Sequence, residues 1–181
     1  SVSDTTALVP APIYGKEARE AVNLLQRFHY RKTVFSDSLS SVFLNAYLES
    51  LDPGKTYFLE SDISEFEPYR YRLDNLTMLE NVEPAYKIFS VFRKRFLHQM
   101  DYVLNDLVKT SFDYTVDDYY DAGREKMPWP KTQSEVDAIW YSNIKSQALS
   151  LKLSGKKPQE IESTLRTRYE RFKKSVIQYN A

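Results

Sequence analysis

Hydrophobic residues recur every three to four positions along most of this chain, which is the spacing of one face of an α-helix. The longest such run begins after Pro84, a residue that fits the first turn of a helix. Its periodic apolar positions are Ala85, Ile88, Phe89, Phe92, Phe96, Met100, Val103, Leu104 and Leu107. A helix of about 25 residues is roughly 37 Å long. The pattern therefore predicts one long central helix.

The chain before Pro84 begins with an aperiodic segment, residues 1–15, which we expect to be a flexible N-terminal arm. Residues 16–30 then follow the helical pattern and predict the first helix. Ser36 is suited to cap a second helix, whose apolar positions end just before Asp52-Pro53-Gly54. Because proline presets one φ angle and glycine accepts positive φ, we expect the chain to reverse at this turn.

A third helix is predicted to begin at Asp62, because Asp62 and Glu65 have the spacing of a reciprocal N-terminal cap. The apolar pattern continues to about residue 76. Pro68 lacks a backbone N–H near the start of this helix, so we expect it to kink the helix there.

The chain after the central helix contains a possible short helix at residues 115–120 and an extended crossing at Met127-Pro128-Trp129-Pro130. Thr132 and Glu135 then have the spacing of a capping box, and the helix that they open is expected to end at Gly155 in a left-handed conformation.

Pro158 opens the last predicted helix. Its apolar stripe consists of Ile161, Leu165, Tyr169, Phe172, Val176 and Tyr179. Taken together, the patterns predict an all-α fold, an irregular bundle of about six to seven helices around one long central helix. Residues 16–181 are expected to form a single domain, since 181 residues suit one ordinary domain.

The composition narrows the possible functions. Lys plus Arg and Asp plus Glu number 25 each, so no overall positive field favours nucleic acid or an anionic membrane. The absence of cysteine excludes disulfides and thiolate chemistry, and no apolar run approaches the length of about 20 residues that spans a bilayer. Fourteen tyrosines and ten phenylalanines against four glycines favour helices packed through aromatic side chains.

No set of residues has the spacing of a catalytic or metal site, so we assign no catalytic, cofactor-binding or metal-binding residue. The two histidines, His29 and His98, lie on different predicted helices without a carboxylate at zinc-ligand spacing. The acidic pairs face apart on a helix, and we interpret them as solvated or capping groups; they are Asp117 with Asp118 and Glu65 with Glu67. Two serine–lysine combinations have the wrong spacing for a helical Ser/Lys pair: Ser150 with Lys152, and Ser154 with Lys156.

Two basic clusters and one aromatic group remain as candidate binding surfaces. We interpret the clusters as solvated charged faces and not as nucleic-acid sites, because their neighbouring aromatics fall on buried stripes. They are Arg93, Lys94 and Arg95, and Arg166, Arg168, Arg171, Lys173 and Lys174. The aromatic group is either a groove for an apolar peptide tail or, as we favour, part of the core; it consists of Tyr57, Phe58, Leu59, Trp129 and Trp140.

Three separated blocks of the sequence carry a family resemblance. They are LDPGKTYFLESDISEFEPYRYRLD at 51–74, REKMPWPK at 124–131 and LKLSGKKPQEIESTLRTRYE at 151–170. With them, most of the chain, from about Ala18 to Glu170, resembles the N-terminal region of the periplasmic tail-specific proteases, also called carboxyl-terminal processing proteases. In that family the region precedes a PDZ domain and a serine peptidase domain with a Ser/Lys dyad, and neither lies within these 181 residues.

The resemblance implies a non-catalytic helical domain of a periplasmic endopeptidase that needs no metal or cofactor. The implied partners are protein substrates with apolar C-terminal tails, an adaptor protein, and the downstream PDZ and peptidase domains of the same polypeptide. Two alternatives stay open. The chain is a free-standing helical protein–protein interaction module that shares ancestry with the protease region, or a metal-dependent helical enzyme.

Overall fold

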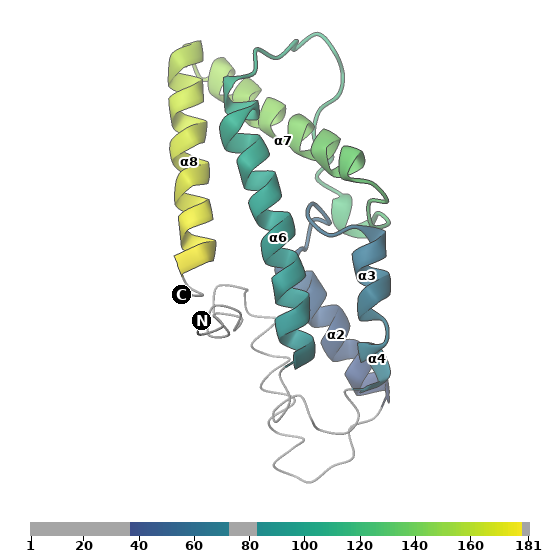
Figure 1. Ribbon diagram of the computed structural model, residues 1–181. Helices are drawn as coiled ribbons and strands as arrows, with labels where there is room; N and C mark the ends of the chain where they lie inside the picture. Colours follow the sequence, from purple (N-terminus) through teal and green to yellow (C-terminus); the bar gives the residue numbers. More distant parts are fainter. Residues whose placement is uncertain (1–36, 73–82, 179–181) are drawn as a thin grey trace.

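The computed structural model describes residues 37–72 and 83–178, and the regular elements in these ranges are all helical (Figure 1). The α-helices are α2 (Asp37–Leu51), α3 (Glu60–Phe66), α4 (Tyr69–Arg72), α6 (Glu83–Asn105), α7 (Gln133–Leu153) and α8 (Pro158–Gln178). Two 3-10 turns, η4 (Leu107–Lys109) and η5 (Arg124–Lys126), complete the described elements. The all-α prediction is confirmed. The expected arm at 1–15 and the expected helix at 16–30 lie outside the described residues.

The predicted long helix is α6, which has 23 residues and includes Pro84 in its first turn. It runs along the molecule with α8 beside it and α7 crossing its upper part, while α2 and α3 lie at its lower half (Figure 1). The predicted apolar stripe faces the core, except that Leu104 is only half-buried. Leu107 is buried as predicted, but it lies just past the helix end, in η4.

The third predicted helix starts earlier than expected and is interrupted near Pro68 as expected, while its predicted end at about residue 76 lies outside the described residues. It begins at Glu60, so Asp62 is its third residue and not its cap, and Glu65 is exposed. The Asp62 carboxylate instead accepts a hydrogen bond from the Leu59 N–H at 2.9 Å, which is half of a capping box. At the other end the helix stops at Phe66 and resumes as α4 after Pro68, because proline cannot donate the backbone hydrogen bond that would continue it.

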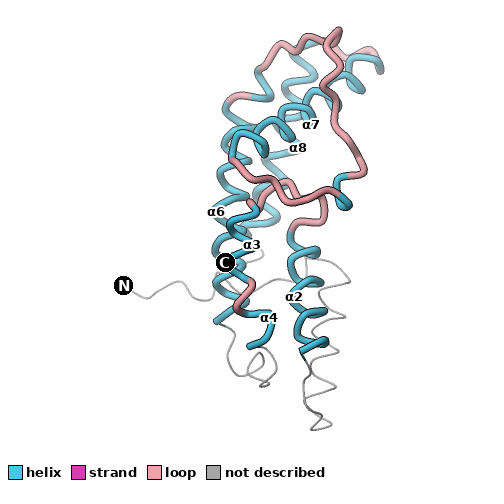
Figure 2. The backbone as a smooth tube through the Cα atoms, turned by 90° about the vertical axis from the view of Figure 1, so that its right-hand side faces the viewer, coloured by secondary structure: helices cyan, strands magenta, loops and turns pink. Residues whose placement is uncertain are grey.

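Residues 110–132, which we call the long loop, return from the upper end of α6 to the level of α3 (Figure 2). The short helix predicted at 115–120 is wrong. The Asp113 carboxylate accepts hydrogen bonds from the Thr115 N–H at 3.0 Å and from the Thr115 hydroxyl at 2.6 Å, and this local turn competes with helix formation. The extended crossing is confirmed at Met127, whose φ and ψ are −84° and 158°.

The predicted ends of α7 and the predicted start of α8 are confirmed. The Thr132 hydroxyl accepts a hydrogen bond from the Glu135 N–H at 3.2 Å, and Gly155 follows α7 with a φ of 95°. Pro158 is the first residue of α8. The predicted stripe of α8 is wrong at Phe172, which is 42% exposed although its ring contacts Phe96 at a centroid distance of 5.5 Å. The other end of that stripe, Tyr179, lies outside the described residues.

Candidate functional site

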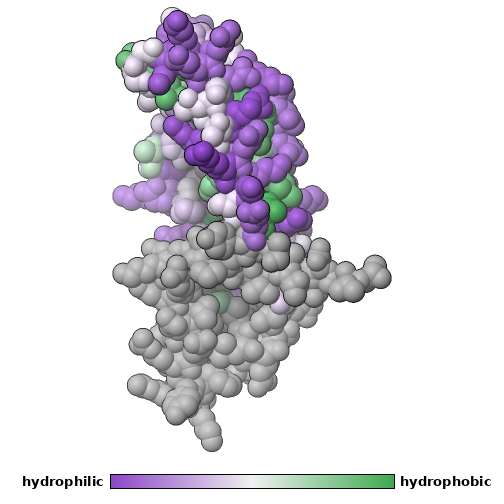
Figure 3. All heavy atoms as spheres, turned by 90° about the vertical axis from the view of Figure 1, so that its left-hand side faces the viewer, coloured by the Kyte–Doolittle hydropathy of each residue, from purple (hydrophilic) through white to green (hydrophobic). Residues whose placement is uncertain are grey.

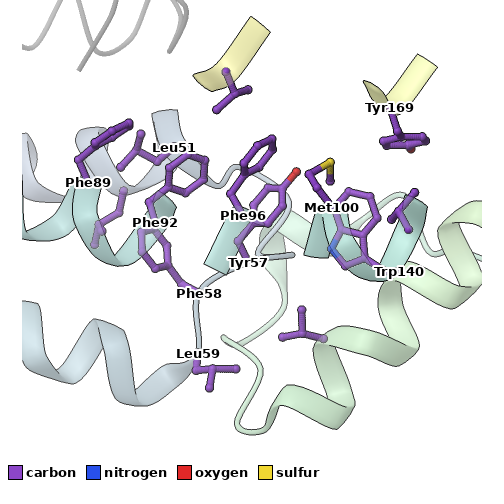
Figure 4. Close-up of a cluster of buried hydrophobic side chains, with 14 of the residues drawn as sticks. Leu51, Tyr57, Phe58, Leu59, Phe89, Phe92, Phe96, Met100, Trp140 and Tyr169 are labelled. Carbon is purple, nitrogen blue, oxygen red and sulfur yellow. The ribbon is translucent and has the colours of Figure 1, made fainter. Parts of the chain in front are cut away.

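The aromatic residues after the first turn are buried at the centre of the molecule, as the core interpretation predicts (Figure 4). The Tyr57 ring has a centroid distance of 5.5 Å to each of three rings, those of Phe92, Phe96 and Trp140. Phe58 is fully buried and packs against rings of α3, α6 and the long loop. These contacts join four segments of the chain, and we call residues 52–59 together with Trp140 the aromatic corner.

Asp52 holds the backbone of the aromatic corner. Its buried carboxylate accepts hydrogen bonds from the N–H groups of Thr56 at 2.8 Å, Tyr57 at 3.0 Å and Phe58 at 3.0 Å. Burial raises the pKa of Asp52, and the three N–H donors oppose that rise. The sequence identified Asp52 only as a turn residue, so its role as a hydrogen-bond acceptor for the following segment was missed.

The turn itself differs from the prediction in one respect. Positive φ falls on Lys55, at 53°, and not on Gly54. The Lys55 ammonium donates a hydrogen bond to the Met127 carbonyl and lies 5.3 Å from the centroid of the Trp129 ring. These contacts with the long loop accompany a backbone conformation that non-glycine residues rarely adopt.

Two more hydrogen bonds fix the aromatic corner to its surroundings. The Trp140 indole N–H donates to the Thr56 carbonyl at 2.7 Å, which connects α7 to the corner. The Arg124 guanidinium donates to the Gly54 carbonyl at 3.2 Å, which connects the long loop to the turn. Burial raises the pKa of the Tyr57 hydroxyl well above its usual value, so this side chain stays neutral in the core.

One residue of the first basic cluster, Arg95, is half-buried in an ion pair. Arg95 of α6 forms a bidentate ion pair with Asp62 of α3, with both nitrogen–oxygen distances at 2.9 Å. Asp62 is 5% exposed, and the two planar hydrogen bonds fix α3 against α6. Arg93 and Lys94 are exposed, as predicted.

The predicted acidic pair Asp117 and Asp118 divides into two different environments. Asp117 is exposed, whereas the Asp118 carboxylate forms an ion pair with the ammonium of Lys145, a buried residue of α7. That ammonium also donates to the Val116 carbonyl at 2.7 Å. Burial acts to lower the pKa of Lys145, but the hydrogen bond and the charge of Asp118 outweigh it and raise the pKa. The sequence carried no signal for this buried lysine.

The second basic cluster lies on α8, on the side of the molecule shown in Figure 3, where the described surface is mostly hydrophilic with small separate apolar patches. Arg166 donates to the Leu104 carbonyl at 3.1 Å and pairs with Glu162 at 3.1 Å. Lys173 pairs with Asp101 of α6 at 3.6 Å. Part of this cluster therefore connects α8 to α6.

The remaining candidate groups lie apart from one another. His98 is exposed, with Nε2 3.9 Å from a carboxylate oxygen of Asp137, and His29 lies outside the described residues. The Ser154 hydroxyl donates to the Leu151 carbonyl, while the Lys152 ammonium lies over the Tyr114 ring. Within residues 37–72 and 83–178, no three potential metal ligands gather, and no helix has the length and apolarity to cross a membrane.

The arrangement defines a class of protein: a helical domain in which buried charges hold loops against helices around an aromatic corner. Comparison with known sequences then gives the family. The family described as "Tail specific protease N-terminal domain" matches residues 21–181, and the chain belongs to that family. A tail-specific protease of Haemophilus influenzae is 32% identical over 152 residues, which cover 83% of this chain and 22% of the relative.

Proposed function

We propose that this chain is the non-catalytic N-terminal helical domain of a tail-specific serine endopeptidase that cleaves periplasmic proteins recognised by their C-terminal tails. Family membership supports the proposal. The matched region is only 22% of the length of the relative, so a protein of similar length has room for further domains. On this proposal those domains are a PDZ domain and a peptidase domain with a Ser/Lys dyad, which need no metal or cofactor from this chain.

The role that we propose for the domain is to position the PDZ and peptidase domains and to dock an adaptor or a substrate. The aromatic corner carries this proposal, because its rings contact rings of α3, α6, α7 and the long loop, while Asp52 holds its backbone. A domain with such a core presents its exposed faces at fixed relative angles. Fixed geometry is what a domain needs if it is to hold other domains in place.

The test compares three forms of the parent enzyme with this chain in isolation. The forms are the intact enzyme, the enzyme without this domain, and the enzyme with its peptidase serine replaced by alanine. Each is assayed on a folded protein with an apolar C-terminal tail and on a short peptide with the same tail. We expect no turnover by the isolated chain. We expect deletion to reduce kcat/KM for the protein more than for the peptide, because only the larger substrate needs docking.

Turnover by the isolated chain would contradict the proposed division of labour, provided that a mock purification shows none. Equal losses for the protein and the peptide would contradict the docking role and leave the positioning role. The alternative, a free-standing interaction module, is tested by sequencing the gene beyond the codon for residue 181. A reading frame that continues into PDZ and peptidase sequence excludes that alternative, and one that stops near residue 181 supports it.

A further inference from the structure

A pocket of about 340 Å³ lies near the C-terminal end of α6 and the first turns of α8, which are at the upper end of the molecule in Figure 1. It is bounded by η4, the first residues of the long loop, the C-terminal half of α7 and the first turns of α8. Its apolar floor consists of Val108, Ala148, Ile161 and Leu165, all buried. Phe112 adds a half-buried aromatic wall, held by an edge contact with Tyr141. We call this hollow the η4–α8 pocket.

Three exposed lysines border the η4–α8 pocket: Lys109, Lys152 and Lys156. Among the described residues, none of their ammonium groups lies within ion-pair distance of a carboxylate. The Lys152 ammonium lies 4.7 Å from the centroid of the Tyr114 ring. Glu162, the acidic side chain among the described residues that line the pocket, is already paired with Arg166. The rim therefore has a positive charge that nearby described side chains do not neutralise.

An exposed apolar side chain follows one of these lysines in the sequence. Leu153, which follows Lys152 at the end of α7, is 79% exposed, the largest exposure among the large hydrophobic side chains of the described residues. A pocket with an apolar floor and a charged rim has the chemistry to receive one anchoring apolar side chain of a partner. The charge of the rim selects for carboxylates on either side of that anchor.

We propose that the η4–α8 pocket docks an acidic segment of a partner protein, with one large apolar side chain in the pocket and its flanking carboxylates on the three lysines. The proposal rests on the docking role given above. It makes that role more specific, because it names the docking surface and the chemistry of the partner. The pocket recognises acidic residues within the partner's chain, and the C-terminus of the partner plays no part in binding.

The test measures binding of the 181-residue chain to fluorescent peptides by anisotropy, at low and high salt. The first probe has a central leucine between glutamates and an amidated C-terminus. The second replaces the leucine with serine, and the third replaces the glutamates with lysines. We expect binding of the first probe only, with affinity that falls as salt screens the lysines. Amide chemical shifts should move for residues that line the pocket.

The decisive variant is the triple charge reversal Lys109→Glu, Lys152→Glu and Lys156→Glu. A matched control reverses three exposed lysines that line no described pocket, Lys126, Lys131 and Lys174, and so changes the net charge equally. Circular dichroism confirms that both variants are folded. We expect the pocket variant to bind the first probe at least about tenfold more weakly than the native chain, and the control to bind within about twofold of it.

Several outcomes would overturn the proposal. These are equal weakening by the two triple variants, equal binding of the acidic and basic probes, and absence of binding to the native chain. Full competition by free glutamate would reduce the site to one for small anions and would also overturn it. None of these results affects membership of the protease family or the deletion experiment on the parent enzyme, so failure here and failure of the proposed function are distinguishable.

Discussion

Replacing Asp52 tests whether the aromatic corner depends on one buried carboxylate. In Asp52→Ala the N–H groups of Thr56, Tyr57 and Phe58 all lose their acceptor. The side chains of these three residues are buried, so we expect water to reach the freed donors poorly. Asp52→Asn keeps one carbonyl oxygen, which retains part of the hydrogen bonding, but presents an amide N–H₂ in place of the other acceptor.

The magnitude follows from the count of donors. A buried donor without an acceptor costs about 1–3 kcal/mol, so three donors cost about 3–9 kcal/mol. Removal of the carboxylate offsets part of this cost. Burial disfavours the ionised form of Asp52, which is why its pKa is raised, and the alanine variant no longer has a buried charge. We expect a net loss of about 3–4 kcal/mol for Asp52→Ala and about 1–2 kcal/mol for Asp52→Asn. Domains of this size are stable by only about 5–15 kcal/mol in total.

The assay is urea unfolding followed by tryptophan fluorescence. Trp140 reports on the corner directly, because its indole donates to the Thr56 carbonyl and its ring packs against Tyr57. With a urea m-value of about 1–3 kcal/mol/M, a loss of about 3–4 kcal/mol should lower the Asp52→Ala midpoint by about 1–4 M. Asp117→Ala, at an exposed carboxylate, is the control and should stay within about 0.5 kcal/mol of the native chain. A loss below about 1 kcal/mol for Asp52→Ala would refute this reasoning.

Three further predictions concern other buried groups. The raised pKa of Tyr57 means that above pH 10 the unfolded chain releases this proton while the folded chain keeps it. Stability should then fall by at least about 1.4 kcal/mol per pH unit, because burial raises the pKa of four other tyrosines as well. Urea titration measures the fall, and a flat profile would contradict this. Arg95→Ala leaves Asp62 without its bidentate partner and should cost about 1–3 kcal/mol in the same assay, whereas Arg93→Ala should have no measurable effect. Lys145→Met should leave the helix content unchanged and speed chymotryptic cleavage of the long loop; unchanged cleavage would show that this lysine does not hold the loop.

The sequence alone determined the longer described helices, α2, α6, α7 and α8, and most of their ends. The period of apolar residues predicted α6, α7 and α8, and local residues set their boundaries: Pro84 in the first turn of α6, Thr132 before α7 and Gly155 after it. These signals act between residues at most four or five positions apart, so a single stretch of chain contains all the information that they need. The buried aromatic block was predicted for the same reason, because its apolarity is a local property.

Only the tertiary structure decided which charged side chains are buried and what they hold. Arg95 meets a carboxylate 33 positions away, Lys145 meets one 27 positions away, and Arg124 reaches a carbonyl 70 positions away. Lys145 contacts Val116 and Asp118 within the segment expected to be a helix at 115–120, and the packing of α8 leaves Phe172 partly exposed. A charged residue is buried when packing brings it a partner, and no local pattern in the sequence records which distant residue that partner is.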